Sequence, residues 1–476
     1  MSSSAARDTY QLCFPATFRE ETVPPDLMRH TDKIKYVFHA ILWQQISKTY
    51  GSTGISVSEP VPLRAAYLQG MIGRRYRRIL GWMLAEGHIE STLSYVPGEH
   101  SREYGWGARH SGAEVISTPV RDRQLRRNME ARCSRRQGET YEKARRNRIV
   151  RVLEHLMRQF SHLEMVPFDL DLLLEKNKEE LREKHDARKE KGEVQGDFCF
   201  EDTARMISAQ VDAVRERIWE REWVFTYCDY HRFHSPLTRL WHRTREYLRW
   251  EGEPLVNLDI KSSQPLFLYF LLRDSLLEPQ SCNSSSSIES HSDPYPLIDP
   301  YDTPFLYYDS RYHTHPSETA HKQADYEDLE EEVNAFGAVL LDGDIYTLLT
   351  EKVGLGDSRE IGKESFFHVV YGTGYMRTPY HEAMESLFPQ IMAEIAKLKK
   401  QDGYKSIAQG MQIAEGDFIL GTVVKRLRRD FRSIPVFTIH DSLMTTPEHS
   451  QTVREIMESE FREEFGVVPE IRTETP

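Results

Sequence analysis

The sequence has few cysteines, and it lacks a long apolar run. Its five cysteines are scattered over 476 residues, and no two of them form a Cys-x-x-Cys pair. This pattern argues against a zinc site and a disulfide framework, and it favours a reducing cytoplasm as the location. No uncharged apolar stretch is long enough to span a bilayer, and the polar start lacks a signal-peptide core. We therefore expect no membrane association.

The net charge of -12 conceals two segments of opposite sign. Residues 278–332 contain thirteen Asp/Glu and two Lys/Arg, whereas residues 121–151 contain twelve Lys/Arg and four Asp/Glu. A basic run usually forms a solvated helix face. Its arginine density nevertheless makes 121–151 a candidate for contact with nucleic-acid phosphates.

The first third of the chain has the pattern of a small DNA-binding domain. Residues 33–50 read as an amphipathic helix. From Leu63 the order is helix, break at Gly70 or Gly73, helix, strand, turn and strand, which resembles a winged helix-turn-helix. Its second helix would carry four arginines for phosphate contact: Arg74, Arg75, Arg77 and Arg78. The residues Pro97–Arg102 would form the wing tip. The alternative is a small helical cap with a solvated arginine face.

A chain of this length predicts more than one domain. We predict a winged-helix-like domain in 1–120, a basic helical region in 121–224, and an α+β core in 225–476. Within the core, residues 279–326 are rich in Ser, His, Asp, Tyr and Pro and have no periodicity. This composition predicts an acidic, irregular insertion.

Two blocks of the core each place one carboxylate in β-structure. Residues 254–272 begin with apolar and polar residues in alternation up to Asp259, which predicts a strand followed by a helix from about Pro265. Residues 434–446 have two β-rich runs around Asp441, which predicts a hairpin with this acid at its tip. Two such strands bring both acids within reach of a Mg²⁺ pair about 4 Å apart.

A third block repeats functional residues at every fourth position: Arg359, Lys363, Phe367 and Tyr371, followed by Gly372. Because steps of four advance only about 40° around a helix, these side chains form one stripe. Cations of this kind hold a triphosphate, and aromatic rings line a sugar and base. Each block alone is common in ordinary proteins. The occurrence of all three in this order is less easily explained by chance.

These blocks together resemble family A DNA polymerases, the DNA polymerase I class, and more distantly single-subunit phage-type RNA polymerases. Further matches are Met411-Gln412 with Asp417, Asp344-Ile345-Tyr346, and Arg232 within residues 227–238. The resemblance covers roughly residues 225–472. It implies a right-hand polymerase fold with an antiparallel palm sheet that carries both acids, helical fingers, and a helical thumb from residues of about 140–222.

The resemblance also implies a role for each matching residue. Asp259 and Asp441, with the backbone carbonyl of Ile260, would bind two Mg²⁺ ions, for which Mn²⁺ is an alternative. Lys363 would also be the proton donor to pyrophosphate. The residues that would bind the nucleoside triphosphate are Arg359, Lys363, Phe367, Tyr371, Gln264 and Tyr346. Those that would contact a DNA primer-template are Arg232, Gln412 and His440.

Three positions depart from the family pattern. Gln264 replaces a Glu that excludes the ribose 2′-OH, Ser442 replaces a Glu after the hairpin acid, and Tyr346 replaces a His. The Gln264 side chain has nearly the size of Glu, but its amide is also able to donate a hydrogen bond to a 2′-OH. The departures therefore leave the choice between deoxyribonucleotides and ribonucleotides open.

We expect a DNA-dependent DNA polymerase of a phage or mobile element. It would lack proofreading, because no Asp-x-Glu arrangement precedes the core. One alternative is an RNA polymerase or primase-like enzyme, with RNA as a further possible template. Others are an enzyme that extends ends without a template, for example in defence, and a DNA-binding replication initiator with an inactive polymerase fold.

Overall fold

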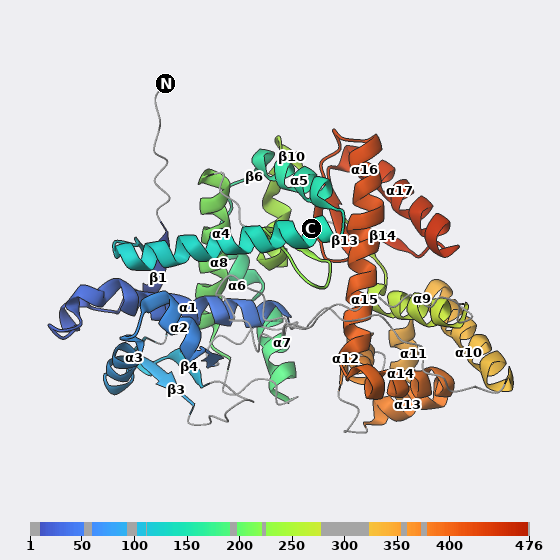
Figure 1. Ribbon diagram of the computed structural model, residues 1–476, viewed down its shortest axis with the longest axis horizontal. Helices are drawn as coiled ribbons and strands as arrows, with labels where there is room; N and C mark the ends of the chain where they lie inside the picture. The colour runs from blue at the N-terminus through green and yellow to red at the C-terminus, as the bar shows by residue number, and fades with distance from the viewer. Residues whose placement is uncertain are drawn as a thin grey trace.

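The computed structural model describes residues 10–51, 60–92, 102–110, 112–190, 198–220, 225–277, 323–353, 359–372 and 378–474. These residues form helices and small antiparallel sheets, so the prediction of an α+β chain is confirmed. In Figure 1 the N-terminal elements lie on the left of the molecule and the C-terminal helices and sheet lie on the right. No helix in these ranges is both long and apolar enough to cross a membrane.

The N-terminal elements enclose a hydrophobic core of their own. The helices are α1 (Thr31–Gly51), α2 (Ala65–Ile72) and α3 (Tyr76–Ala85). β1 (Gln11–Pro15) pairs with β5 (Val115–Pro119), and β4 (Glu103–Trp106) lies between β2 (Val61–Pro62) and β3 (Ile89–Ser91). From α2 to β4 the helices and strands follow the order predicted from Leu63 onwards, whereas β2 between α1 and α2 was not predicted. Residues 97–101 of the predicted wing tip lie outside the described residues.

The break between α2 and α3 is at Gly73, and Gly70 lies within α2. Gly73 has a φ of 84°, in the left-handed region that glycine adopts without steric cost. Arg74 and Arg75 then form the turn before α3. The prediction that these two arginines lie on the second helix is therefore wrong, because the chain needs them to change direction after α2 has ended.

Two histidines form a buried pair in the N-terminal core. The rings of His88 and His110 stack, and their Nδ1 and Nε2 atoms share a hydrogen bond of 2.9 Å. His110 Nδ1 is also hydrogen-bonded to Thr17 Oγ1 at 2.7 Å. Burial is the main reason why the pKa of each histidine falls to about 4. The pair is thus built to stay neutral.

We expect acidification to weaken this core. The unfolded chain takes up protons near the ordinary histidine pKa of 6.5, whereas folded His88 and His110 take them up only near pH 4. Their contribution to stability is therefore complete above 6.5 and is lost as the pH falls towards 4, at about 1.4 kcal/mol for each unit of pKa displacement. Urea denaturation across this range tests the expectation. The double substitution His88→Gln/His110→Gln should make the free energy of unfolding less dependent on pH. An unchanged pH dependence would contradict the role of this pair.

One continuous helix, α4 (Arg123–Arg146), connects this core to a second, larger one. Asp122 caps its start by accepting a hydrogen bond of 2.8 Å from the backbone N–H of Leu125. Leu125 and Met129 pack into the N-terminal core, whereas Ala144 packs into the larger core. The predicted domain boundary between residues 120 and 121 therefore lies just before a helix that contributes side chains to both cores.

The larger core includes both the middle of the chain and its C-terminal part. The middle helices are α5 (Val150–Gln159), α6 (Leu170–Lys176), α7 (Lys178–Glu190) and α8 (Phe200–Glu220). β9 (Leu248–Trp250) pairs with both β6 (Leu163–Met165) and β10 (Glu253–Pro254), and β7 (Thr226–Tyr227) pairs with β8 (Phe233–His234). The helices predicted as a thumb therefore share their core with the predicted palm.

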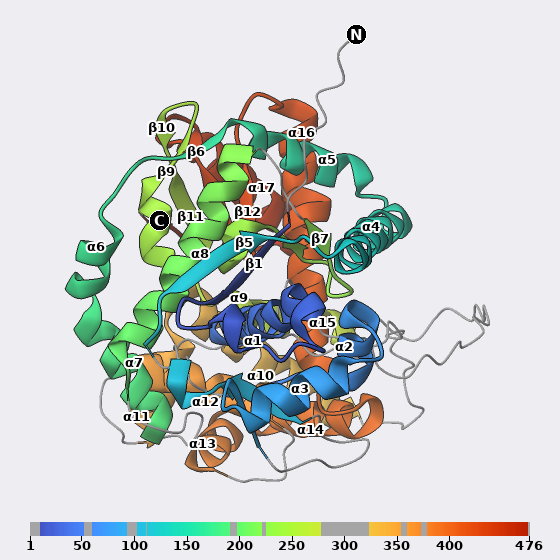
Figure 2. The same ribbon diagram turned by 90° about the vertical axis from the view of Figure 1, so that its left-hand side faces the viewer.

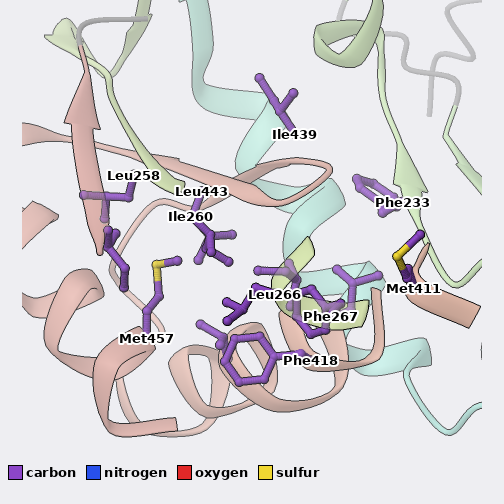
Figure 3. Packing of buried hydrophobic residues seen from close by; sticks show 14 of the residues in the cluster. Phe233, Leu258, Ile260, Leu266, Phe267, Met411, Phe418, Ile439, Leu443 and Met457 are labelled. Carbon is purple, nitrogen blue, oxygen red and sulfur yellow. The ribbon is translucent and has the colours of Figure 1, made fainter. Parts of the chain in front are cut away.

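A four-stranded antiparallel sheet lies at the centre of the larger core, in the order β12-β13-β11-β14. The strands are β11 (Val256–Ile260), β12 (Phe437–Ile439), β13 (Ser442–Thr445) and β14 (Ile471–Glu474). Leu258 and Ile260 are buried on one face, with Met457 and Phe418 among the core side chains around them (Figure 3). Because side chains alternate along a strand, Asp259 faces the opposite side.

Helices surround this sheet and extend below it in Figure 1. They are α9 (Ser263–Leu277), α10 (Gln323–Asp342), α11 (Ile345–Val353), α12 (Arg359–Tyr371), α13 (Pro379–Leu387), α14 (Pro389–Asp402), α15 (Ser406–Gly416), the π-helical η7 (Asp417–Val424), α16 (Lys425–Asp430) and α17 (Pro447–Phe465). The predicted irregular insertion is wrong for residues 323–326, because α10 begins at Gln323. Residues 279–322 lie outside the described residues.

Candidate active site

Asp259 on β11 and Asp441 in the turn before the adjacent strand β13 lie at one end of the four-stranded sheet. Asp259 is paired in register with Ser442 of the neighbouring strand. Asp441 directly precedes Ser442, in the turn that connects β12 to β13. His440 in this turn has a φ of 56°, a left-handed conformation that non-glycine residues seldom adopt. The strand and the hairpin predicted from the sequence thus bring the two acids together.

The surroundings of both acids disfavour their charged forms. Burial raises the pKa of Asp441, and the negative charges of Glu415 and Asp259 raise it further. Burial also raises the pKa of Asp259, with a further contribution from Glu474. Two carboxylates in this position repel one another, so a bound cation would relieve a cost that the fold imposes.

Helix α12 presents the predicted stripe of cations and aromatic rings. Arg359 is fixed at its start, where its Nε donates a hydrogen bond of 2.5 Å to Asp344 Oδ2 and its guanidinium lies 4.9 Å from the ring centre of Tyr346. Further along, the rings of Phe367 and Tyr371 have their centres 5.2 Å apart. The predicted fingers residues of α11 and α12 therefore contact one another directly.

The stripe also reaches the acids. Lys363 is exposed, and its positive charge lowers the pKa of Asp259. Burial is the main reason why the pKa of Tyr371 and of Tyr346 rises, and the negative charge of Asp441 adds to it. An exposed ammonium group thus acts by its charge on one carboxylate of the pair.

A glycine sets the distance between α11 and α12. A Cβ added to Gly362 would lie 1.8 Å from the backbone oxygen of Tyr346, so only glycine allows this approach. Gly362→Ala is expected to move α12 away from α11 and to lower the free energy of unfolding by about 1–3 kcal/mol or more. Gly138→Ala is a matched control within a helix, because a Cβ at Gly138 meets nothing within 4 Å. The Gly138→Ala variant should be slightly more stable than the wild type. Equal free energies of unfolding for the two variants in urea denaturation would contradict the packing argument.

Glu415 is a buried acid of the site that sequence reasoning missed. It is fully buried on α15, where its carboxylate accepts hydrogen bonds from Arg232, from Gln264 and, at 3.0 Å, from Ser263 Oγ. Gln264 in turn accepts a hydrogen bond of 2.7 Å from the hydroxyl of Tyr371. The only signal in the sequence is its spacing of three from Gln412, which places both on one side of α15.

This network decides how Gln264 is oriented. A carboxylate only accepts hydrogen bonds, so the NH₂ group of Gln264 must face Glu415 and its oxygen must face Tyr371. The amide donor that the sequence suggested for a ribose 2′-OH is thus directed to a protein acid. In the structure Gln264 is a neutral spacer between Glu415 and Tyr371.

The predicted primer-template residues of the core lie around the acids. Arg232 is paired with Glu415, and its charge opposes the rise in the pKa of Asp441. Gln412 is buried and hydrogen-bonded to Tyr371. Burial lowers the pKa of His440, so its ring is neutral, and its buried Nδ1 has no hydrogen-bond partner among the described residues. Non-glycine residues with positive φ recur at this site: His231, Ser262 and His440.

The arginines predicted to dock DNA are not part of this cluster. Arg77 and Arg78 lie in the first turn of α3, on the far side of the molecule from β13 in Figure 1. Arg78 forms an ion pair of 2.5 Å with Asp26, whereas Arg77 donates a hydrogen bond of 3.0 Å to the hydroxyl of Tyr76. All four predicted arginines, Arg74, Arg75, Arg77 and Arg78, are exposed.

The donors at the acid pair suit magnesium. In the part of the chain that the structure describes, no three His, Cys, Asp or Glu side chains form a metal-binding group. Asp259 and Asp441 alone would therefore hold an ion through carboxylate oxygens, with the backbone carbonyl of Ile260 as a third protein donor. Mg²⁺ commonly binds in this way, since it keeps several waters and takes its other oxygens from substrate phosphates.

Comparison with known proteins leaves the family open. No protein-family model matches the chain, and no curated protein matches it. Membership of the family A polymerases thus stays a prediction from the motifs. The case for a function rests on the residues at the acid pair and on their geometry.

Proposed function

We propose that the chain is a nucleic-acid polymerase that adds nucleotides to the 3′-OH of a primer on a template. The observation that carries this proposal is the position of Lys363, on the exposed face of α12, close enough to lower the pKa of Asp259. A carboxylate pair alone suits many hydrolases. A cationic and aromatic helix face across from the pair suits a substrate with phosphates, a sugar and a base.

In this proposal each residue of the site acts on the nucleotide or on the growing end. Divalent cations held by Asp259 and Asp441 would supply charge neutralisation for the transferred phosphoryl group and the leaving pyrophosphate. The 3′-OH of the primer loses its proton to water, its oxygen forms a bond to the α-phosphorus, and the bond between this phosphorus and pyrophosphate breaks. Lys363 binds the phosphates and gives a proton to the pyrophosphate, while Phe367 and Tyr371 line the space for the sugar and base.

The N-terminal elements would supply a second contact with nucleic acid. Exposed arginines at the start of α3 are suited to phosphates, which carry most of the affinity of DNA-binding proteins. Arg74 and Arg75 have the greatest freedom to do so, since they stand in an exposed turn. The basic helix α4 runs from this region to the larger core and would continue the same contact (Figure 1).

Extension of a labelled DNA primer-template with Mg²⁺ tests the proposal. We expect extension with deoxyribonucleotides, and much less with ribonucleotides. Preference for ribonucleotides would move the enzyme to the RNA polymerase class, and extension of the primer without a template would make it a terminal transferase. Binding of the primer-template without extension under any of these conditions would favour the replication-initiator alternative.

Gln264→Ala is expected to weaken sugar selection. Removing the side chain opens the space in front of Tyr371, so incorporation of ribonucleotides relative to deoxyribonucleotides should rise by about tenfold or more. Single-nucleotide incorporation with matched substrates measures the ratio. Phe367→Leu is a control, because it alters the aromatic lining but leaves the Gln264–Tyr371 hydrogen bond in place. An unchanged ratio in Gln264→Ala would remove this residue from sugar selection.

A further inference from the structure

A second cationic site lies apart from the acid pair, between α5 and α16. It is a surface depression of about 260 Å³, lined by Arg151, Glu154, His155, Arg158, Arg428 and Arg432. The first four come from one face of α5, at spacings of three and four, and the last two come from α16 and the turn after it. Figures 1 and 2 both show α5 beside α16.

The arginines of this depression are not used in ion pairs. Among the described residues, no ion pair with an acid is found for Arg151, Arg158, Arg428 or Arg432, and Glu154 is the only acid in the lining. Neighbouring arginines on α16 behave differently. Arg429 donates two hydrogen bonds of 2.7 Å to Asp430, and Arg426 lies 2.5 Å from Glu460. In the described part of the chain, the arginines on one side of α16 are therefore neutralised and those on the other side have no ion pair, although the Nε of Arg432 donates a hydrogen bond of 3.2 Å to the backbone oxygen of Arg428.

One lining residue of the depression has a buried polar atom without a partner among the described residues. His155 is 4% exposed, and its Nε2 has no hydrogen-bond partner among the described residues. The same holds for the Nε of Arg428. Native proteins seldom leave such groups unsatisfied, because an unmade hydrogen bond costs free energy, and a bound water or ion is one explanation of the exceptions.

We propose that this depression binds two neighbouring phosphate groups of one polyanionic ligand. Four guanidinium groups against one carboxylate leave an excess of three positive charges, more than a single phosphate neutralises. Arginine also matches phosphate oxygens with paired hydrogen bonds. The volume is below the roughly 300–1,000 Å³ of pockets that enclose a whole small molecule, so the site suits a compact oligophosphate or a segment of a nucleic-acid backbone.

The depression is distinct from the candidate active site. Arg432 precedes β12, whereas Asp441 follows it, so the two sites lie at opposite ends of this edge strand. Phe160, at the end of α5, packs against Phe437 of β12 with ring centres 5.1 Å apart. The depression therefore lies on a helix, α5, that contacts the β12–β13 hairpin. None of the depression's lining residues belongs to this hairpin.

Calorimetric titration of the full chain with tripolyphosphate, and separately with a short single-stranded oligonucleotide, tests the proposal. Arg428→Ala is expected to weaken binding of the true ligand by about tenfold or more, because hydrogen bonds to a charged partner are lost. Glu154→Gln should strengthen it, since the only acid of the lining becomes neutral. Arg429→Ala is the matched control, as it removes a positive charge from the same helix on the paired side.

The outcomes separate the two sources of phosphate. A loss confined to tripolyphosphate would identify a small oligophosphate as the ligand. A loss with the oligonucleotide, together with a smaller dependence of affinity on salt, would identify a nucleic-acid backbone. If Arg428→Ala and Glu154→Gln bind both ligands as Arg429→Ala does, the depression is not a phosphate site.

Discussion

The substitution Asp441→Asn is expected to stabilise the metal-free protein while it abolishes nucleotide addition. The buried Asp441 carboxylate lies beside Asp259 and Glu415, and both charges disfavour its ionised form. An amide of the same shape removes this repulsion. The free energy of unfolding at neutral pH should rise by at least about 1 kcal/mol, because each unit of pKa displacement corresponds to about 1.4 kcal/mol. Urea denaturation in the presence of a chelator measures the change.

The same substitution removes one of the two carboxylates proposed to hold the catalytic ions. Loss of several kcal/mol of charge stabilisation in the transition state should slow nucleotide addition at least about a thousandfold. Glu474→Gln is the matched control, since Glu474 also acts on Asp259 by its charge but is exposed on the edge strand. It should keep most of the activity. A destabilised Asp441→Asn protein, or one with nearly normal activity, would contradict this account of the acid pair.

Glu415→Gln is expected to cause a large loss of stability. Glu415 is fully buried and holds the guanidinium of Arg232, whose side chain is only 12% exposed. Removing one partner of a buried ion pair leaves the other charge without compensation, at a cost of about 3–5 kcal/mol. Gln264 and Ser263 would also lose the carboxylate to which they donate. Urea denaturation measures the loss of stability. The substitution should also remove the acceptor that orients the amide of Gln264.

Glu460→Gln provides the comparison for Glu415→Gln. Glu460 also pairs with an arginine, Arg426, but that arginine is more exposed and also contacts Glu463 and Asp430. Its loss should cost about 1 kcal/mol or less. The double substitution Arg232→Met/Glu415→Met should recover part of the stability lost in Glu415→Gln, because it leaves no buried charge unpaired. Equal losses of stability in Glu415→Gln and Glu460→Gln would show that burial does not increase the contribution of the Arg232–Glu415 pair to stability.

The local parts of the site were predictable from the sequence. The strand at Asp259, the hairpin at Asp441 and the helix from Arg359 to Tyr371 each have a periodicity that repeats within a few residues. Such patterns depend on neighbours along the chain, and the structure places these elements where they were expected. The break at Gly73 was one of two positions that the sequence allowed.

The remainder depends on contacts between distant parts of the chain. Glu415 becomes part of the site through Arg232 and Ser263, which are 183 and 152 residues away in the sequence. No local pattern indicates such contacts. For the same reason the sequence suggested a donor role for Gln264 towards the sugar, whereas in the structure Glu415 takes its amide. The sharing of α4 by two cores was equally hidden, because its few apolar residues lie in a run dominated by charge.

The most direct test of the central claim is single-nucleotide addition to a primer-template as a function of Mg²⁺ concentration. Wild-type protein, Asp259→Asn and Asp441→Asn would be compared, with urea denaturation to show that all three fold. We expect addition by the wild type that depends on Mg²⁺, and a loss of at least about a thousandfold in both variants. Addition that persists in either folded variant, or wild-type addition without any divalent ion, would contradict the assignment of Asp259 and Asp441 as the metal-binding pair of a polymerase.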